Sequence, residues 1–545
     1  MGLPTLPQHA DWQDRAERAR ALARQREDYV WVHMPGQPPF CKGVPAGEAF
    51  SRAKRRSMAW DVAGTMADFA LSAVVRFGRK SDTVRSFDRF YPLQRLPDVA
   101  TRWTTDREFA RQRINGINPT LIRLADHIPE KFPVTDETVR GLLPEGQSLG
   151  RLLGERRLFI VDYAPLEGLR KVMGRFQEAP IGLFWRDDDG HLMPLALQLG
   201  QSPAVAPVIF TPKDEHWLWL TARTHFQCAD GTYHEVVAHL TRTHLVMETF
   251  WVAAARTLPP QHPLHVLLRP HFTGTIEINH EARGTLIAPG GPIDETIAIG
   301  AEGSLTLVGK EYETWSFDRF EPYRELESRG VLSKSVLPDY FYRDDALAFY
   351  EAIKRFTGEV IGHYYRSDDD IRQDEELQAW MRELVSRDGG RVAGLPLDGD
   401  RLHRVEDLHR IVAQVIFLTA IEHSAVNNGQ FDQFGYIPNS PGALYLPPPT
   451  DRDARSEANF VYALPAAKQV EAQILMVHLL SDETLTPLGS YPPDFFVGVP
   501  AVRGAVDRFR ADIADIGREI ARRNAELTVP YRYLDPPFVA RSIAT

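Results

Sequence analysis

The sequence predicts a mainly α-helical fold with a few short strands. From about residue 216 onward, long stretches carry apolar residues at helical spacing. Hydrophobic residues make up 43% of the 545 residues and charged residues 25%, so the chain can bury a large core rather than stay disordered. No linker rich in Pro, Gly or Ser separates two halves. We therefore expect one large helical domain over residues 1–545.

The first 110 residues contain two predicted helices. Residues 11–28 are charged, Ala-rich and helical in pattern. Residues 57–77 are apolar, although Asp61, Asp68 and Arg76 interrupt them. A plain buried helix is the interpretation that we favour for this second segment. The alternative is an amphipathic helix that covers a cavity or makes a peripheral contact with a membrane.

The region before residue 216 also contains the predicted strands. Residues 80–150 are irregular in pattern, with many Arg, Asp and Pro residues. Residues 158–163 and 206–210 have the composition of short buried strands. The sheet should therefore be a small part of the fold.

Two long apolar helices follow, and capping signals set their ends. The first is expected to begin near Thr232, at a Thr-x-x-Glu capping box, and to end by Leu258, because two prolines follow. The second runs from near Asp407 to Asn428, which a glycine follows. Polar side chains in helices this apolar need buried partners.

Histidines at five-residue spacing distinguish the first of these helices. His234, His239 and His244 would each be turned by about 140° from the last in a regular α-helix, so they could not share one ligand geometry. Convergence requires a locally wider π turn. We therefore predict a distortion around residues 238–244. The same spacing gives HExxxH instead of HExxH, which argues against a zinc protease.

The second helix carries two more candidate ligands. His423 and Asn427 lie four residues apart, so both side chains are on one face and can reach one ion. Neutral imidazoles, an amide oxygen and a carboxylate are credible ligands for a redox-active iron. A lone buried histidine is more often a hydrogen-bonded core residue. That interpretation is kept for His216, His225, His262, His265 and His271.

Composition excludes several other classes of protein. The net charge is -10 and basic residues are not concentrated in one tract, so nucleic acid is not expected as a partner. Cys41 and Cys228 are the two cysteines, too few for a disulfide framework. Neither a signal peptide nor an uninterrupted apolar run of membrane-spanning length is evident, so we expect a cytoplasmic location.

Several motifs together resemble the lipoxygenase family over roughly residues 110–545. The first long helix is approached by Trp219-x-x-Ala222-Arg223 and followed by Glu248-Thr249-Phe250. Further motifs are Arg256-x-Leu258-x-x-x-His262-Pro263, His423-x-x-x-Asn427-x-Gly429-Gln430, Gly435-Tyr436-x-Pro438-Asn439 and Arg541-Ser542-Ile543-Ala544-Thr545. The chain looks like the compact bacterial members. Residues 1–109 would be a variable helical part, without the β-barrel lipid-binding module of animal and plant members.

The resemblance implies one non-haem iron per chain. Its ligands would be His239, His244, His423, Asn427 and the terminal carboxylate of Thr545, where isoleucine is usual in the family. Glu235, Gln430 and His234 would lie just outside these ligands and orient them. The other interpretation of Glu235 is a helix cap.

The resemblance also implies a set of residues around the substrate. They are Gly231, Ala282, Leu286, Ile287, Ile293, Thr296 and Ile297. Alanine at position 282 goes with S-hydroperoxide products in the family. Glycine at position 231 would deepen the pocket, whereas the bulky Ile293 and Ile297 would shorten it. The position of the carbon that is oxygenated therefore stays open.

The implied activity is dioxygenation of a polyunsaturated fatty acid. An iron-bound hydroxide would take hydrogen from the bis-allylic carbon, molecular oxygen would then add, and no side-chain base would be needed. Fatty acid and oxygen would be the partners, with no protein partner implied. Two alternatives stay open: a hydroperoxide isomerase that forms epoxyalcohols on the same iron, and a non-catalytic lipid-binding protein.

Overall fold

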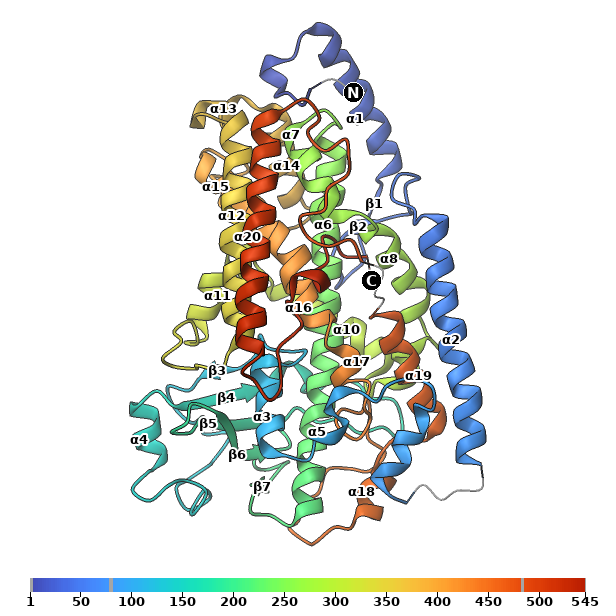
Figure 1. Ribbon diagram of the computed structural model, residues 1–545, viewed down its shortest axis with the longest axis vertical. Coiled ribbons are helices and arrows are strands. Elements are labelled where there is room, and N and C mark those ends of the chain that lie inside the picture. The colour runs from blue at the N-terminus through green and yellow to red at the C-terminus, as the bar shows by residue number, and fades with distance from the viewer. Residues whose placement is uncertain (1–2, 78–81, 482–484, 545) are drawn as a thin grey trace.

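A long helical rod forms the centre of the molecule (Figure 1). The computed structural model describes residues 3–77, 82–481 and 485–544. The rod consists of α5 (His216–Tyr233), a π-helical segment (His234–Leu245) and α6 (Val246–Thr257) without a break. Nearly every residue in it is buried, because apolar side chains occupy all of its faces.

The helix that carries the candidate ligands His423 and Asn427 packs against this rod. It consists of α15 (Val405–Phe417), a π turn (Leu418–Glu422) and α16 (His423–Asn427). On its other side α15 contacts α12 (Phe341–Tyr364), which in turn packs along α20 (Pro500–Asn524). These layers hold the two candidate helices in a fixed relation deep inside the protein.

The remaining helices surround the rod. Near the start of the chain are α1 (Trp12–Asp28), α2 (Arg52–Arg76), α3 (Asp106–Asn115) and α4 (Leu149–Gly154). After the rod come α7 (Pro263–Leu268), α8 (Thr275–Glu281), a second π segment (Ala282–Leu286), α9 (Pro292–Thr296), α10 (Gly300–Thr314), α11 (Pro322–Ser328), α13 (Asp368–Gln373) and α14 (Glu375–Val385). Towards the C-terminus are α17 (Gln430–Gln433), α18 (Glu457–Ala463) and α19 (Ala467–Leu479).

A five-stranded antiparallel sheet lies at one end of the rod, at the lower left in Figure 1. Neighbouring strands follow one another in sequence, and Leu158 pairs with Trp185 in its centre. The strands are β3 (Arg123–Leu124), β4 (Leu158–Asp162), β5 (Ile181–Arg186), β6 (Leu192–Gln198) and β7 (Ile209–Phe210). A two-stranded hairpin, β1 (Trp31–Val32) and β2 (Phe40–Cys41), lies elsewhere.

The predicted elements are recovered to different degrees. The mainly helical fold, the helix over 11–28 and the strand over 158–163 are confirmed, and Asp11 caps the helix through its carboxylate. The strand over 206–210 is shorter than predicted, and β5 and β6 were not predicted. Their residues are buried on both faces, which removes the alternating pattern that marks a half-exposed strand.

The prediction of a plain buried helix over 57–77 is wrong. Helix α2 runs along the edge of the molecule in Figure 1 and packs mainly against α19. Among the described helices it is the one long and apolar enough to cross a membrane by length and composition, yet only 22% of that stretch is buried. Apart from Phe69, its large apolar residues therefore do not belong to the core.

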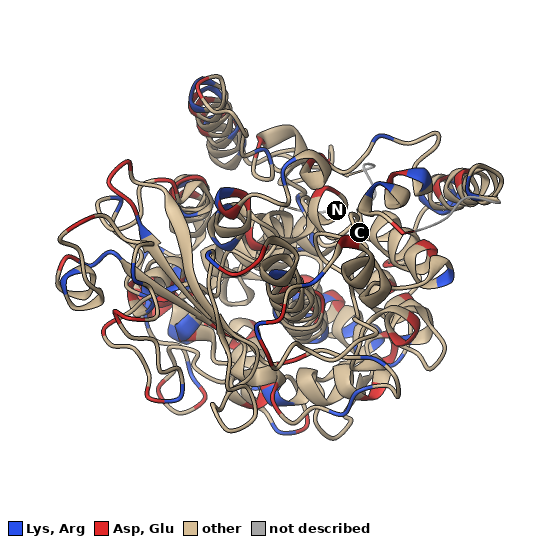
Figure 2. Ribbon diagram, turned by 90° about the horizontal axis from the view of Figure 1, so that it is seen from below, with Lys and Arg blue, Asp and Glu red and all other residues tan. Residues whose placement is uncertain are grey.

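Charged residues of both signs are distributed around the periphery of the molecule (Figure 2). Many of them form short-range pairs such as Arg508 with Glu359 and Arg355 with Asp512. Mixed charge of this kind gives no extended field of one sign.

Candidate metal centre and substrate cavity

The π-helical segment brings the five-residue histidine steps into line. With hydrogen bonds from residue i to i+5, side chains five apart lie almost above one another. Thr241 and Val236 are also five residues apart, and the hydroxyl of Thr241 donates to the carbonyl of Val236, 2.5 Å away. The predicted distortion around 238–244 is confirmed, and it extends over His234–Leu245.

The predicted start of this helix near Thr232 is wrong. The helix begins at His216, where the carboxylate of Glu215 accepts hydrogen bonds from the next backbone amides. Thr232 lies in mid-helix, and its hydroxyl donates to the side chain of Gln177. Glu235 is therefore not a helix cap. The predicted end at Leu258 is confirmed.

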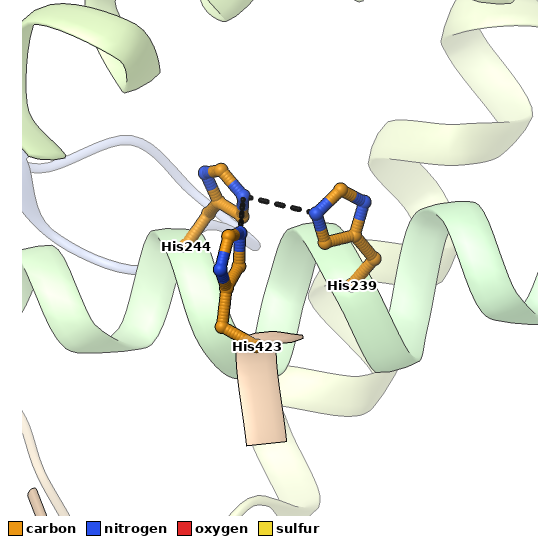
Figure 3. A group of neighbouring side chains, drawn as sticks. All are labelled: His239, His244 and His423. Atoms are coloured by element: carbon orange, nitrogen blue, oxygen red, sulfur yellow. Dashed lines mark hydrogen bonds between the residues drawn. The ribbon is translucent and has the colours of Figure 1, made fainter. Parts of the chain in front are cut away.

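Three imidazoles meet at one point (Figure 3). The Nε2 atom of His244 lies 3.2 Å from that of His239 and 3.1 Å from that of His423. All three side chains are buried, and their candidate ligand atoms lie within 4.8 Å of one another. His239 and His244 come from the π segment and His423 from the start of α16. Two distorted helices thus present three nitrogens to one another.

These nitrogens fit a metal ion better than they fit one another. Burial lowers the pKa of His244 to about 3 and also lowers the pKa of His239 and of His423, so all three are neutral near pH 7. Neutral imidazole nitrogens are ligands for iron. Two nitrogens about 2.1 Å from one ion at right angles would be about 3.0 Å apart, close to the observed separations.

Asn427 and Gln430 lie beside this cluster. Asn427 is on the same helix as His423, one turn later, and is buried. Its Oδ1 accepts a hydrogen bond of 2.8 Å from the side-chain amide of Gln430. Gln430 therefore orients the amide of the fourth predicted ligand.

The C-terminal segment enters the interior at the same place. Val539 and Ile543 are fully buried, and the backbone amide of Ala540 donates to the hydroxyl of Ser424, the residue after His423. The carbonyl of Ile543 accepts from the hydroxyl of Thr275 at 3.0 Å. The fifth predicted ligand, Thr545, lies outside the described residues.

His234 and Glu235 lie outside the cluster of three histidines and contact the groups around it. His234 contacts the carbonyl of Val426 through Nε2 at 2.7 Å, and so ties the π segment to α16. The carboxylate of Glu235 lies 3.4 Å from Nδ1 of His234 and 4.0 Å from Nδ1 of His239. Glu235 also faces the adjoining cavity.

A cavity of about 190 Å³ opens beside the histidine cluster. Its walls are mostly apolar, as a lipid chain requires. Three of the predicted substrate residues line it: Ala282, Leu286 and Ile293. Glu235, His239 and His244 form the wall on the metal side.

The structure does not place the other four predicted substrate residues on this cavity. Ile287, Thr296 and Ile297 are buried away from it, and the hydroxyl of Thr296 donates to the carbonyl of Pro292. At Gly231 an added Cβ would lie 2.6 Å from a ring carbon of Phe434. The space that was expected to deepen the pocket is therefore filled by this aromatic ring.

Sequence reasoning missed three residues that support the cluster. Asn279 accepts a hydrogen bond from Nδ1 of His244 at 2.9 Å. The carboxylate of Glu248 accepts from Asn279 at 2.9 Å and from Arg283 at 2.6 Å. Glu248 lies inside one of the motifs named above, but spacing alone does not reveal that Asn279 is the partner of a histidine 35 residues away.

A second group of metal-binding residue types has a different explanation. His262, Asp374 and Glu376 are close enough to share an ion. Asp374 already accepts from His262 at 3.0 Å and from the hydroxyl of Tyr365 at 2.6 Å, and Glu376 pairs with Arg18. Their charges are matched by protein groups, so His262 stays a structural residue.

Comparisons with known proteins agree with this geometry. The lipoxygenase family model matches residues 54–535. Human polyunsaturated fatty acid lipoxygenase ALOX15B is 34% identical over 546 residues, which cover 97% of this chain and 80% of that protein. Human hydroperoxide isomerase ALOXE3 is 35% identical over 457 residues, covering 82% of this chain and 63% of that protein.

Solved structures match over the whole chain. A lipoxygenase crystallised anaerobically with arachidonate has a TM-score of 0.95 and 30% identity, covering 100% of this chain and 84% of that one. Coral 8R-lipoxygenase has a TM-score of 0.93 and 30% identity, covering 100% and 83%. The matched relatives include human, mouse, rat and coral proteins, and they give no support to the predicted likeness to bacterial members in particular.

Proposed function

Since the chain belongs to the lipoxygenase family and is a dioxygenase, we propose that it oxygenates polyunsaturated fatty acids at an iron held by His239, His244 and His423. The observation that carries this proposal is the convergence of three neutral Nε2 atoms from two π-wound helices beside an apolar cavity. An iron bound there would supply the one-electron chemistry that side chains lack.

Asn427 and the carboxylate of Thr545 complete the proposed ligand set. Asn427 is supported by its place one turn after His423 and by the hydrogen bond that orients its amide. Thr545 is supported by the buried path of residues 539–543 towards Ser424. A buried carboxylate is costly unless it is paired or bound to a metal.

The protein's own contribution is to hold the substrate and exclude water. Ala282, Leu286 and Ile293 give the lipid chain an apolar wall next to His239 and His244. We assign S stereochemistry to the product, because Ala282 lines the cavity beside His239 and His244, where its methyl would cover one end of the reacting pentadiene. We also propose that residues 1–545 act as one catalytic domain, since the larger hydrophobic core extends from Leu6 to Ile543.

A hydroperoxide isomerase is the second candidate. The observation in its favour is the 35% identity to human hydroperoxide isomerase ALOXE3. The same histidine cluster and cavity would serve both reactions. Oxygen consumption separates them, because an isomerase converts an added hydroperoxide without net uptake of oxygen.

The proposal is tested by iron content and oxygen uptake with linoleate and arachidonate. We expect about one iron per chain and a hydroperoxide product, and loss of both in His244→Ala, because packing cannot replace a ligand. The matched control is His225→Ala, which removes a buried imidazole whose ring nitrogens bond to nothing among the described residues. Full iron in His244→Ala would contradict the proposal.

A further inference from the structure

Helix α2 turns several large apolar residues outward and buries two polar residues beside one aromatic residue, Phe69. Trp60 is 77% exposed and Val74 71%, and Phe77, at the C-terminal cap, is 88% exposed. The residues buried against the body include Asp68 and Ser72, at 1% and 0% exposure. A helix that borders water has the opposite arrangement. The outer face of α2 is therefore built for a surrounding other than water.

The inward polar residues fix this orientation. The carboxylate of Asp68 accepts a hydrogen bond of 2.9 Å from the backbone amide of Leu93. Arg76 donates to the hydroxyl of Ser72 at 3.0 Å and pairs with Glu471 of α19. Rotating the helix to hide its apolar face would break these bonds. They also argue against a membrane-spanning role, in which lipid would have to surround the whole helix.

The charges of α2 select the surface on which it can lie. Four basic residues, Arg52, Lys54, Arg55 and Arg56, lie at the N-terminal end of the helix, where Arg55 pairs with Glu277, whereas Arg76 at the other end pairs with Glu471. The chain as a whole carries a net charge of -10. Basic residues concentrated at one end of an exposed apolar helix attract anionic lipid headgroups. We propose that the outer face of α2 lies flat on an anionic lipid bilayer.

The same helix adjoins the substrate cavity. Met58 lines the cavity, together with His239 and His244. The carboxylate of Glu277 in α8 binds Arg55 at 2.7 Å, and so ties the start of α2 to the helix that leads to Ala282. Docking of α2 would therefore bring the cavity to the lipid surface where fatty acids dissolve. This link to substrate rests on the proposed function, whereas bilayer binding itself does not.

The test is flotation of the iron-loaded protein with vesicles of phosphatidylcholine alone or mixed with phosphatidylglycerol. We expect binding to the mixed vesicles and a drop of about tenfold in Trp60→Ser/Val74→Ser, because two apolar contacts with lipid are lost. Arg52→Glu/Arg56→Glu should remove the preference for phosphatidylglycerol. The controls are Trp12→Ser, a tryptophan of α1 that is 76% exposed, and Arg20→Glu/Arg24→Glu on the same helix.

Two results would overturn the proposal. One is the absence of binding to mixed vesicles, or an equal loss in Trp12→Ser. The other is a dimer in solution that Trp60→Ser/Val74→Ser converts to a monomer, because α2 would then be covered by a second copy. Oxygen uptake with dispersed linoleate, which the α2 variants should retain, reports separately on the proposed function.

Discussion

The Nδ1 atom of His244 lies 2.9 Å from the Oδ1 atom of Asn279. The amide group of Asn279 donates to the carboxylate of Glu248 at 2.9 Å and to the backbone carbonyl of His244 at 3.0 Å, so its oxygen must face the imidazole. An acceptor at this place keeps the proton of neutral His244 on Nδ1. The lone pair of Nε2 then points at His239 and His423, as a metal ligand must.

Replacing Asn279 by leucine should weaken iron binding. Without an acceptor, His244 is free to take the other tautomer and to turn its lone pair away. We expect a loss of iron affinity of about 10-fold to 100-fold, measured by titration of the metal-free protein. Asn439→Leu is the control, since it removes another buried amide in a different network. Equal affinities for the two variants would argue against an orienting role.

Extending the C-terminus should cost both iron and oxygen uptake. An added peptide turns the terminal carboxylate of Thr545 into an amide and adds bulk where Val539 and Ile543 are already fully buried. Removing Thr545 would leave the chain about 3.5 Å short. Thr545→Ile should be tolerated, because the main-chain carboxylate stays. A tagged chain with full iron and full oxygen uptake, measured beside an N-terminally tagged control, would remove Thr545 from the ligand set.

Replacing Ala282 by glycine should shift the product from an S to an R hydroperoxide at a neighbouring carbon. Ala282 lines the cavity beside His239 and His244, and loss of its methyl opens the other end of the pentadiene to oxygen. Chiral chromatography of the products measures the shift. Gly284→Ala in the same π segment is the control, since a Cβ there meets no atom within 4 Å. Mainly R product from the unchanged protein would contradict the assignment.

Acid should destabilise the fold through histidines outside the metal cluster. Burial lowers the pKa of His225, of His265 and of His271 to about 3. The unfolded chain takes up protons below about pH 6.5 while these folded imidazoles do not, so stability is full above pH 6.5 and falls as the pH drops towards 3.

The expected slope is at most about 1.4 kcal/mol per pH unit for each histidine. Urea unfolding at a series of pH values from 7 to about 5 measures it. His265→Gln should flatten the curve, because one of the three groups can no longer bind a proton. The same slope in His265→Gln and in the unchanged protein would show that His265 does not contribute.

The sequence predicts most of the candidate site because its spacing has geometric consequences. His239 and His244 are five positions apart, and their side chains cannot converge in a regular helix, so the sequence alone predicts a wider turn. His423 and Asn427 are four positions apart, which places both side chains on one face without a distortion. The π turn at Leu418–Glu422, just before His423, has no such signal and was not predicted.

Other features depend on contacts that spacing does not encode. The ring of Phe434 fills the space beside Gly231 from a position 203 residues later, so the size of the glycine says nothing about the depth of the pocket. Helix α2 has a composition that fits a core, but Asp68 and Ser72 determine which side faces inward. Thr232 matched a capping box, although Glu215 caps the helix almost five turns earlier.

The π-helical segment between His239 and His244 makes the metal cluster sensitive to the length of the chain more than to its composition. Gaining one residue there, for example an alanine after Thr241, would leave a six-residue step, at which the two imidazoles diverge by about 120° in a regular helix. Thr241→Ala would keep the count and remove a single hydroxyl contact. Iron retained by the insertion and lost by the substitution would reverse this ranking.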